Sequence, residues 1–198
     1  MHTNCKVNDK QFNESNLAHY LLDHLKGIEI GASFHNPFCL YTINVDYTNE
    51  MTPFKKQEQV IAGNLVNVDV VAPGDNLPFP DGSQDFVIIS HVIEHFYDPI
   101  KAIKEWLRVV RKGGYVYMII PHRDRTFDKD RKRTRLSELI GRHEKPNPTH
   151  SNDPLTHQSV WILEDFLELC KHFNWKVVEM QDIDDKVGNG FTVVIQKD

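Results

Sequence analysis

The chain lacks the sequence features of a disulfide framework, a membrane span and a secreted precursor. Its three cysteines, Cys5, Cys39 and Cys170, are far apart and form no CxxC pair, so we expect reduced thiols. No apolar run approaches the roughly 20 residues of a transmembrane helix. Residues 1–6 also lack the apolar core of a signal peptide. We therefore expect a cytoplasmic globular protein without a membrane span; the sequence leaves its oligomeric state open.

An excess of positive charge, which is usual in general nucleic-acid-binding proteins, is also missing. The formal net charge is −5 at pH 7, which argues against a nucleic-acid partner. Basic side chains are instead concentrated between Arg123 and Arg135. Arginine binds phosphate or carboxylate through two parallel hydrogen bonds, so this stretch fits an anionic ligand. A solvated charged loop is the alternative interpretation.

The clearest structural signal lies in residues 77–121. The run Phe86–Ile89 is typical of a strand buried on both faces. Asp98 can cap a helix, in which apolar residues then repeat at helical spacing up to Gly113. Tyr115–Ile120 forms a second buried strand. A strand–helix–strand unit predicts two parallel strands joined by a right-handed crossover.

The flanking segments predict further strands and helices. Ser15 or Asn16 begins a first helix, which Gly27 ends. Further strands are expected over Ile28–Ile30, Tyr41–Asp46, Leu65–Val71, Trp175–Met180 and Phe191–Gln196, and helices over 51–59, over 136–140 and after a cap at Ser159. The last two strands form a hairpin. The predicted fold is α/β, a Rossmann-like, doubly wound, mostly parallel sheet in one domain, residues 1–198.

Residues 122–158 interrupt this alternation after the fifth strand. The segment is polar and contains Pro146, Pro148 and Pro154, which prevent long elements. Long insertions in compact domains are usually functional or disordered. This one leaves the carboxyl end of a buried strand, the edge at which ligands bind in such sheets. We therefore interpret residues 122–158 as a lid.

The motifs resemble those of a known enzyme family. LPFPDGSQD at 77–85, SHVIEH at 90–95 and the pair Gly113-Gly114 follow one another in this order. That order resembles the second half of small class I S-adenosylmethionine-dependent methyltransferases. The resemblance implies S-adenosylmethionine as cofactor, a seven-stranded sheet and a last strand antiparallel to its neighbour.

Three further segments, HNPF at 35–38, NVDYT at 44–48 and PHRDRTFDKDR at 121–131, resemble family members associated with polysaccharide and glycoconjugate synthesis. The resemblance implies methyl transfer to an oxygen of a small polar acceptor: a sugar, a nucleotide-linked sugar or a phosphorylated metabolite. Two alternatives remain open. One is a cofactor-binding partner subunit without catalysis, and the other is a nucleic-acid methyltransferase.

The resemblance also implies a cofactor site. Residues 29–33 resemble the acidic-x-Gly-x-Gly loop beneath the methionine end of the cofactor, with Ser33 in place of the second glycine. Asp46 ends the second strand, where a carboxylate can bind ribose hydroxyls. The residue that contacts adenine does not align cleanly, and Asp69 is preferred over Asp75. The expected cofactor-binding residues are Glu29, Gly31, Ala32, Ser33, Asp46, Asp69, Ser90 and His91.

His122 is the candidate general base, because it directly follows the fifth strand and an imidazole titrates near neutral pH. His157 is the second candidate, and bonding of lid backbone is the alternative role for His122. The expected acceptor-binding residues are Arg123, Arg125, Arg131 and Arg133.

A metal site is not predicted. His143, His150 and His157, with Asp124 and Asp153, are the polar residues of the lid that suggest one. Their spacing is not that of a zinc site, and no cysteine accompanies them.

Overall fold

The computed structural model of the chain describes residues 14–32, 38–52, 55–56, 59–60, 67–147 and 149–198. Its elements, in chain order, are α1 (Asn16–Leu22), β1 (Gly27–Ile30), β2 (Thr42–Asp46), β3 (Val70–Val71), β4 (Gln84–Ser90), the 3₁₀ helix η1 (Ile93–His95), α3 (Pro99–Val109), β5 (Val110–Pro121), the 3₁₀ helix η2 (Arg123–Arg125), α4 (Leu136–Glu144), α5 (Leu163–His172), β6 (Lys176–Gln181) and β7 (Gly190–Gln196).

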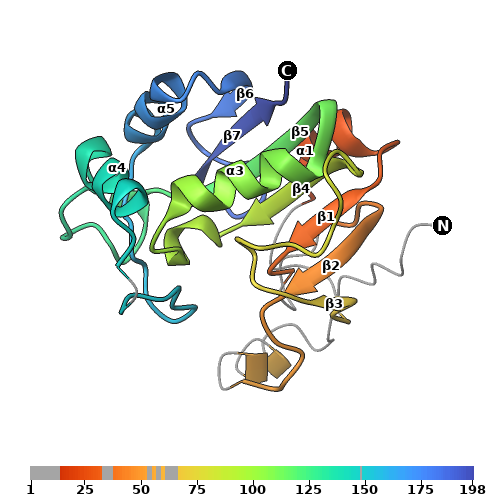
Figure 1. Cartoon of the computed structure of the whole chain (residues 1–198), viewed down its shortest axis with the longest axis horizontal. Helices are drawn as coiled ribbons and strands as arrows, with labels where there is room; N and C mark the ends of the chain where they lie inside the picture. Colours follow the sequence, from red (N-terminus) through yellow and green to blue (C-terminus); the bar gives the residue numbers. More distant parts are fainter. Residues whose placement is uncertain (1–13, 33–37, 53–54, 57–58, 61–66, 148) are drawn as a thin grey trace.

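The strands form one seven-stranded sheet in the order β3-β2-β1-β4-β5-β7-β6 (Figure 1). β1 to β5 pair in parallel. β7 lies between β5 and β6 and is antiparallel to both. The predicted α/β fold, with its last strand reversed, is therefore confirmed.

Both faces of the sheet are covered. Successive residues of a strand point to opposite faces, and here Val87 packs in the cluster with Trp106 of α3 and Phe166 of α5. Phe86 packs on the other side with Leu22 of α1. Figure 1 shows α3 lying across β4 and β5. This coverage explains why β4 and β5 read as continuous apolar runs.

The central unit forms as its sequence predicts, apart from the end of its helix. The side chain of Asp98 accepts the N–H of Lys101 at 2.9 Å, and Pro99 is the first residue of α3. The helix ends at Val109, and the chain passes into β5 at once. At Gly114 an added Cβ would lie 2.3 Å from the carbonyl oxygen of Asp85. Only glycine allows β4 and β5 to approach so closely there.

Two further expected boundaries are wrong, and two expected elements lie partly outside the described residues. The third strand covers Val70–Val71 rather than 65–71; residues 67–69 are not strand, and 61–66 lie outside the described part. The expected helix over 51–59 also falls partly on undescribed positions. Ser159 does not cap α5, because its Oγ accepts from Arg142 at 3.0 Å. The Asp165 carboxylate accepts the N–H of the cap residue Ile162 instead.

The cysteine prediction is wrong at one position. Cys39 is disulfide-bonded, whereas Cys170 is a free, buried cysteine.

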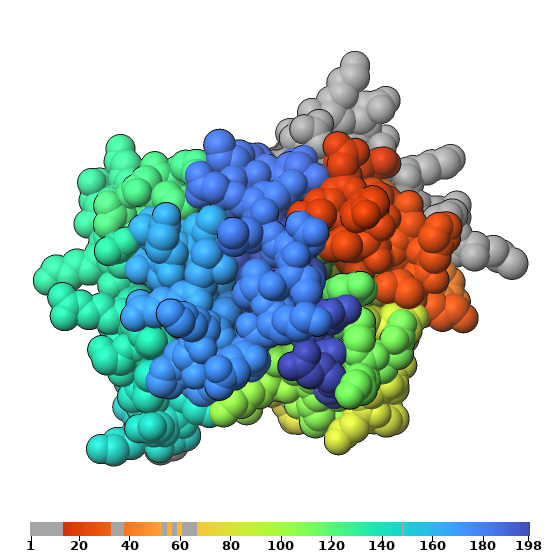
Figure 2. Space-filling view, turned by 90° about the horizontal axis from the view of Figure 1, so that it is seen from above, coloured from red at the N-terminus to blue at the C-terminus, as the bar shows by residue number. Residues whose placement is uncertain are grey.

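Seen from above, the amino-terminal part (red) lies beside the carboxyl-terminal part (blue) (Figure 2). There the N–H of Leu17 donates to Oδ2 of Asp185 at 3.0 Å. Within the described ranges, no helix is long and apolar enough to cross a membrane.

Candidate active site

The carboxyl ends of four parallel strands meet at one edge of the sheet. Ile30 of β1 pairs with Val45 of β2 and with Ile89 of β4, and Ser90 pairs with Ile119 of β5. Gly31, His91 and His122 directly follow strands at this edge, where ligands bind in a doubly wound sheet.

The turn after β1 requires glycine at position 31. Gly31 has φ +67°, and an added Cβ would lie 2.8 Å from Cγ2 of Val92. Both the backbone angle and this contact exclude larger residues. Ala32 follows at the same edge and is partly exposed. Ser33 and the adjoining His35 and Asn36 lie outside the described residues.

Glu29 stands in β1 with its carboxyl group buried. Oε1 accepts the N–H of Phe38 at 3.1 Å, and Oε2 accepts the hydroxyl of Thr42 at 3.4 Å. Burial raises the pKa of Glu29 to about 7, and these hydrogen bonds and the charge of Lys186 oppose the shift. Glu29 therefore fixes the chain at Phe38 and Thr42, where it re-enters β2.

The two acidic candidates near β2 have different partners. Oδ1 of Asp46 accepts the N–H of Thr48 at 3.2 Å, and Oδ2 is ion-paired with Lys55. Oδ2 of Asp69 accepts the N–H of Asn44 at 2.9 Å. Asp69 thus holds the edge of β2 next to β3, whereas Asp46 stands at the strand tip.

Ser90 is the last residue of β4, and His91 follows it. Ser90 is 8% exposed, and its Oγ has no hydrogen-bond partner among the described residues. His91 has φ +53°, and its N–H donates to the carbonyl of Ile119 at 2.9 Å. A left-handed conformation is uncommon for histidine and often marks a functional turn.

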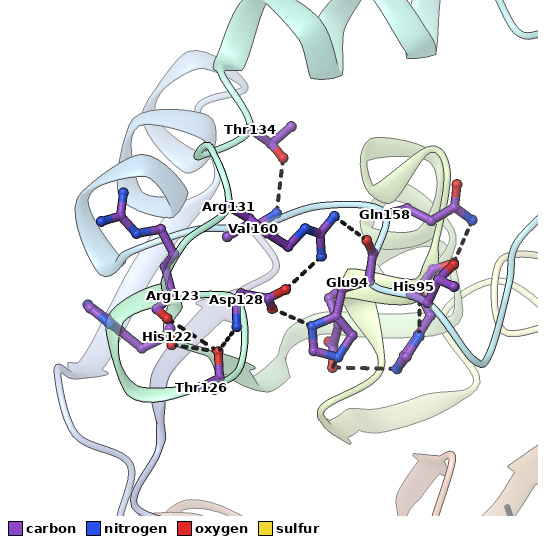
Figure 3. A network of polar contacts seen from close by, with 12 residues as sticks. Glu94, His95, His122, Arg123, Thr126, Asp128, Arg131, Thr134, Gln158 and Val160 are labelled. Atoms are coloured by element: carbon purple, nitrogen blue, oxygen red, sulfur yellow. Dashed lines mark hydrogen bonds and ion pairs between the residues drawn. The ribbon is translucent and has the colours of Figure 1, made fainter.

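Hydrogen bonds from Asp153, Gln158 and Ser159 hold the chain to η1, and Figure 3 shows the side chain of Gln158 bonded to His95. The carbonyl of Glu94 accepts the N–H of Gln158 at 2.7 Å and that of Ser159 at 3.2 Å. The carbonyl of His95 accepts the side-chain amide of Gln158 at 3.1 Å. The chain from 151 to 161 therefore forms an ordered wall beside the tip of β4.

The side chains of Glu94 and His95 meet that of His157, which belongs to this wall. Oε1 of Glu94 lies 3.6 Å from Nε2 of His95 and 3.8 Å from Nε2 of His157. The Glu94 side chain is fully buried, and neither of its oxygens has a hydrogen-bond partner among the described residues. Burial, together with the nearby charge of Asp128, raises the pKa of Glu94 to about 8.

The other ring nitrogens of the two histidines point at acceptors. Nδ1 of His95 lies 3.1 Å from the carbonyl oxygen of Asp153 and 3.0 Å from that of Thr156. Nδ1 of His157 lies 2.5 Å from Oδ2 of Asp128. Because carbonyls and carboxylates only accept, both Nδ1 atoms carry the proton in the neutral ring. Each Nε2 then presents a lone pair toward Glu94.

In His122 the proton lies on the other ring nitrogen, Nε2. Its Nδ1 accepts the N–H of Asp124 at 3.1 Å and caps η2. Burial, followed by the charge of Arg125, lowers its pKa. In the neutral ring the proton therefore lies on Nε2, so the free nitrogen is a donor in this arrangement.

The four expected acceptor-binding arginines all have acidic partners. Nη1 of Arg131 lies 2.6 Å from Oδ1 of Asp128. The other three pair with Asp124, Asp182 and Asp165 respectively, in the order Arg123, Arg125 and Arg133. Each of the four is therefore in an ion pair with a carboxylate, so they do not form a purely basic surface.

Sequence reasoning does not identify Glu94 and Asp128 as site residues, and it favours a structural role for His95. The available signal was weak: Glu94-His95 is an acidic-His pair just beyond a predicted strand. Nothing in the spacing connects it to His157, 63 residues after Glu94 by the sequence numbers. Only the fold of residues 122–158 brings them together.

The fold is the one found in solved S-adenosylmethionine-dependent methyltransferases. A structure from Thermotoga maritima, described as a possible histamine N-methyltransferase, superimposes with a TM-score of 0.57 and 18% identity over 91% of this chain and 86% of that one. A methyltransferase from Methanosarcina mazei gives 0.55 and 17% over 91% and 96%. At the sequence level, a family model described as a methyltransferase domain matches residues 28–118.

Two curated relatives match over parts of their length. An uncharacterized protein of Methanocaldococcus jannaschii is 33% identical over 107 residues, which are 52% of this chain and 48% of that protein. A ubiquinone/menaquinone biosynthesis C-methyltransferase of Geotalea daltonii is 29% identical over 93 residues, 46% of this chain and 39% of its own. The chain thus spans about half the length, or less, of these relatives.

Proposed function

We propose that the chain binds S-adenosylmethionine across the tips of β1, β2 and β4 and transfers its methyl group to an acceptor. The observation that carries the proposal is the glycine turn at Gly31, held against Val92, with Asp46 at the neighbouring strand tip. Both lie inside the matched methyltransferase region. Methyl transfer is a displacement at the sulfonium methyl, so positioning of the two substrates supplies most of the rate enhancement.

The acceptor side lies beyond β4 and β5. The polar groups there are imidazoles, carboxylates and arginines, which favour a small polar acceptor with a hydroxyl group. A sugar, a nucleotide-linked sugar or a phosphorylated metabolite has this chemistry. A carbon acceptor is the competing possibility, because one relative is named a C-methyltransferase.

Of the two histidines proposed for catalysis, the contacts favour His157 over His122 as the base, because in the neutral rings Nε2 of His157 has the lone pair and Nε2 of His122 has the proton. Nδ1 of His122 is engaged by the N–H of Asp124. His122→Asn keeps an acceptor atom at the cap and removes the imidazole. If His122 is the base, kcat falls by on the order of 10²–10⁴-fold. A change of only a few fold assigns it to the cap.

The test begins with calorimetry of S-adenosylhomocysteine on the purified chain, followed by a screen of hydroxylated and phosphorylated acceptors for methyl transfer. Binding with turnover supports the enzyme. Binding without turnover across the screen favours the catalytically inactive partner subunit, and the absence of binding contradicts the proposal.

A further inference from the structure

We propose that Glu94, His95 and His157 bind a divalent transition-metal ion, with Asp128 orienting one of the histidines. The proposal depends on side-chain geometry and stands whatever the acceptor is. The three ligand atoms all lie within 4.8 Å of one another. They come from η1 and from the far end of residues 122–158, so only the folded chain assembles them.

The distances fit a bound cation better than direct hydrogen bonds. Nε2 of His95 and Nε2 of His157 lie 3.6 and 3.8 Å from Oε1 of Glu94, beyond normal hydrogen-bond length. Ligand atoms about 2.0–2.2 Å from a shared tetrahedral zinc are roughly 3.3–3.5 Å apart. The two distances from Glu94 therefore exceed those of a zinc site by only a few tenths of an ångström, and all three ligand atoms lie within 4.8 Å of one another.

The electrostatics of the three groups also favour a bound cation. Two imidazole lone pairs and a buried carboxyl group with no hydrogen-bond partner among the described residues face one small volume. Lone pairs that converge without a proton or a cation repel one another, so the site needs one or the other. A cation at this point satisfies all three groups at once.

The surroundings supply the second set of contacts that metal-binding histidines usually have. Such histidines donate their other N–H to a carboxylate or a backbone carbonyl, which fixes ring orientation. His157 does so to Asp128, and His95 to the carbonyls of Asp153 and Thr156. Asp128 is itself held by Arg131 at 2.6 Å.

The chemistry of the three ligands limits which metal ions can bind. Two imidazoles and one carboxylate suit Zn²⁺, Fe²⁺ and similar ions rather than Mg²⁺ or Ca²⁺, which prefer oxygen. Three protein ligands leave a coordination position for a water or an acceptor oxygen. A hydroxyl bound there would lose its proton more easily.

The experiment uses the full chain without a histidine tag, stripped with a chelator. Zn²⁺ is titrated by calorimetry and Co²⁺ by visible absorption. We expect one ion per chain, with proton release. Glu94→Gln and His157→Asn should abolish this binding, whereas Asp128→Asn should weaken it by roughly 10–100-fold. The matched control is His172→Asn, an exposed histidine of α5, which should bind as the parent does.

Circular dichroism establishes that each variant is folded, and X-ray absorption of the zinc-loaded parent gives a readout that needs no variant. Two imidazole nitrogens with oxygen at about 2.0–2.2 Å support the site. Sulfur ligation, the absence of stoichiometric binding, or equal binding by the parent, Glu94→Gln and His157→Asn would overturn it.

Discussion

Nζ of Lys55 lies 3.1 Å from Oδ2 of Asp46, so the carboxylate at the tip of β2 already has a cationic partner. Oδ1 of the same group accepts the N–H of Thr48. A ribose that hydrogen-bonds to Asp46 must therefore displace Lys55 or share the carboxylate with it. Lys55 therefore affects how Asp46 can bind a cofactor, although nothing in the sequence around Lys55 indicates this role.

Asp46→Ala should weaken the binding of S-adenosylhomocysteine by about 1–3 kcal/mol, the range for lost hydrogen bonds to a charged group. Lys55→Met should leave the affinity unchanged or raise it, because a competitor is removed. Calorimetry measures both. Asp81→Ala, which removes a carboxylate that is 80% exposed, controls for net charge. Equal affinity in Asp46→Ala and the parent would place the ribose elsewhere.

The stability of the cofactor-free protein should fall as pH rises from about 4.5 to about 7, because of Glu29. In this window the unfolded state has released the proton and the folded state retains it, so unfolding is favoured at higher pH. The difference between the two pKa values corresponds to about 3 kcal/mol. Glu94, whose pKa is also raised, supplies part of this slope, so in denaturant unfolding curves measured across the window Glu29→Gln should reduce the slope rather than remove it. Glu179→Gln, at an exposed position of β6, should retain it.

Gly31→Ala should destabilise the fold by more than the roughly 1–2 kcal/mol that a left-handed backbone costs an L-residue. Gly188 isolates this backbone cost, since it has φ +83° and no atom within 4 Å of an added Cβ. Gly188→Ala should therefore cost less than Gly31→Ala. Val92→Ala, introduced together with Gly31→Ala, should recover the difference, as thermal unfolding would show. An equal loss of stability in Gly31→Ala and Gly188→Ala would show that the contact with Val92 does not contribute.

Arg131→Gln should lower stability by about 1–3 kcal/mol, because it leaves the buried carboxylate of Asp128 without its cation. Arg133→Gln should cost only about 0–1 kcal/mol, since Arg133 is half exposed and lies 3.6 Å from Asp165. Once an acceptor is known, Arg133→Gln should raise its KM and reduce the dependence of KM on salt. A salt-independent KM in the parent would exclude an anionic acceptor held by these side chains.

The fold could be predicted from the sequence because local signals agreed with one another. The cap at Asp98, the helical repeat behind it and the apolar runs on either side all require a parallel unit. Errors arose where a long-range contact decided the outcome. Ser159 is a residue type that often caps helices, but Arg142 and the carbonyl of Glu94 hydrogen-bond to it, and the cap is Ile162, three residues later.

The same reasoning could place only part of the candidate site. Gly31, Asp46 and Ser90 could be placed because strand tips of a parallel sheet share one edge. The group around Glu94 could not, because it depends on the path of residues 122–158, which has little periodicity to read. Charge counting also treated Arg131 as available for a ligand, whereas its partner Asp128 is only three residues away in sequence.

The position of β7 has a consequence for synthesis on the ribosome. β5 lies between β4 and β7, and its register with β7 runs from Tyr115 to Pro121. While residues 190–196 are still inside the exit tunnel, that flank of β5 is an open edge whose residues from Val116 onward are buried in the finished fold. Such an edge invites pairing with other chains. The nascent domain is therefore most exposed to aggregation just before its last strand emerges, and a chaperone that covers β5 would act in that interval.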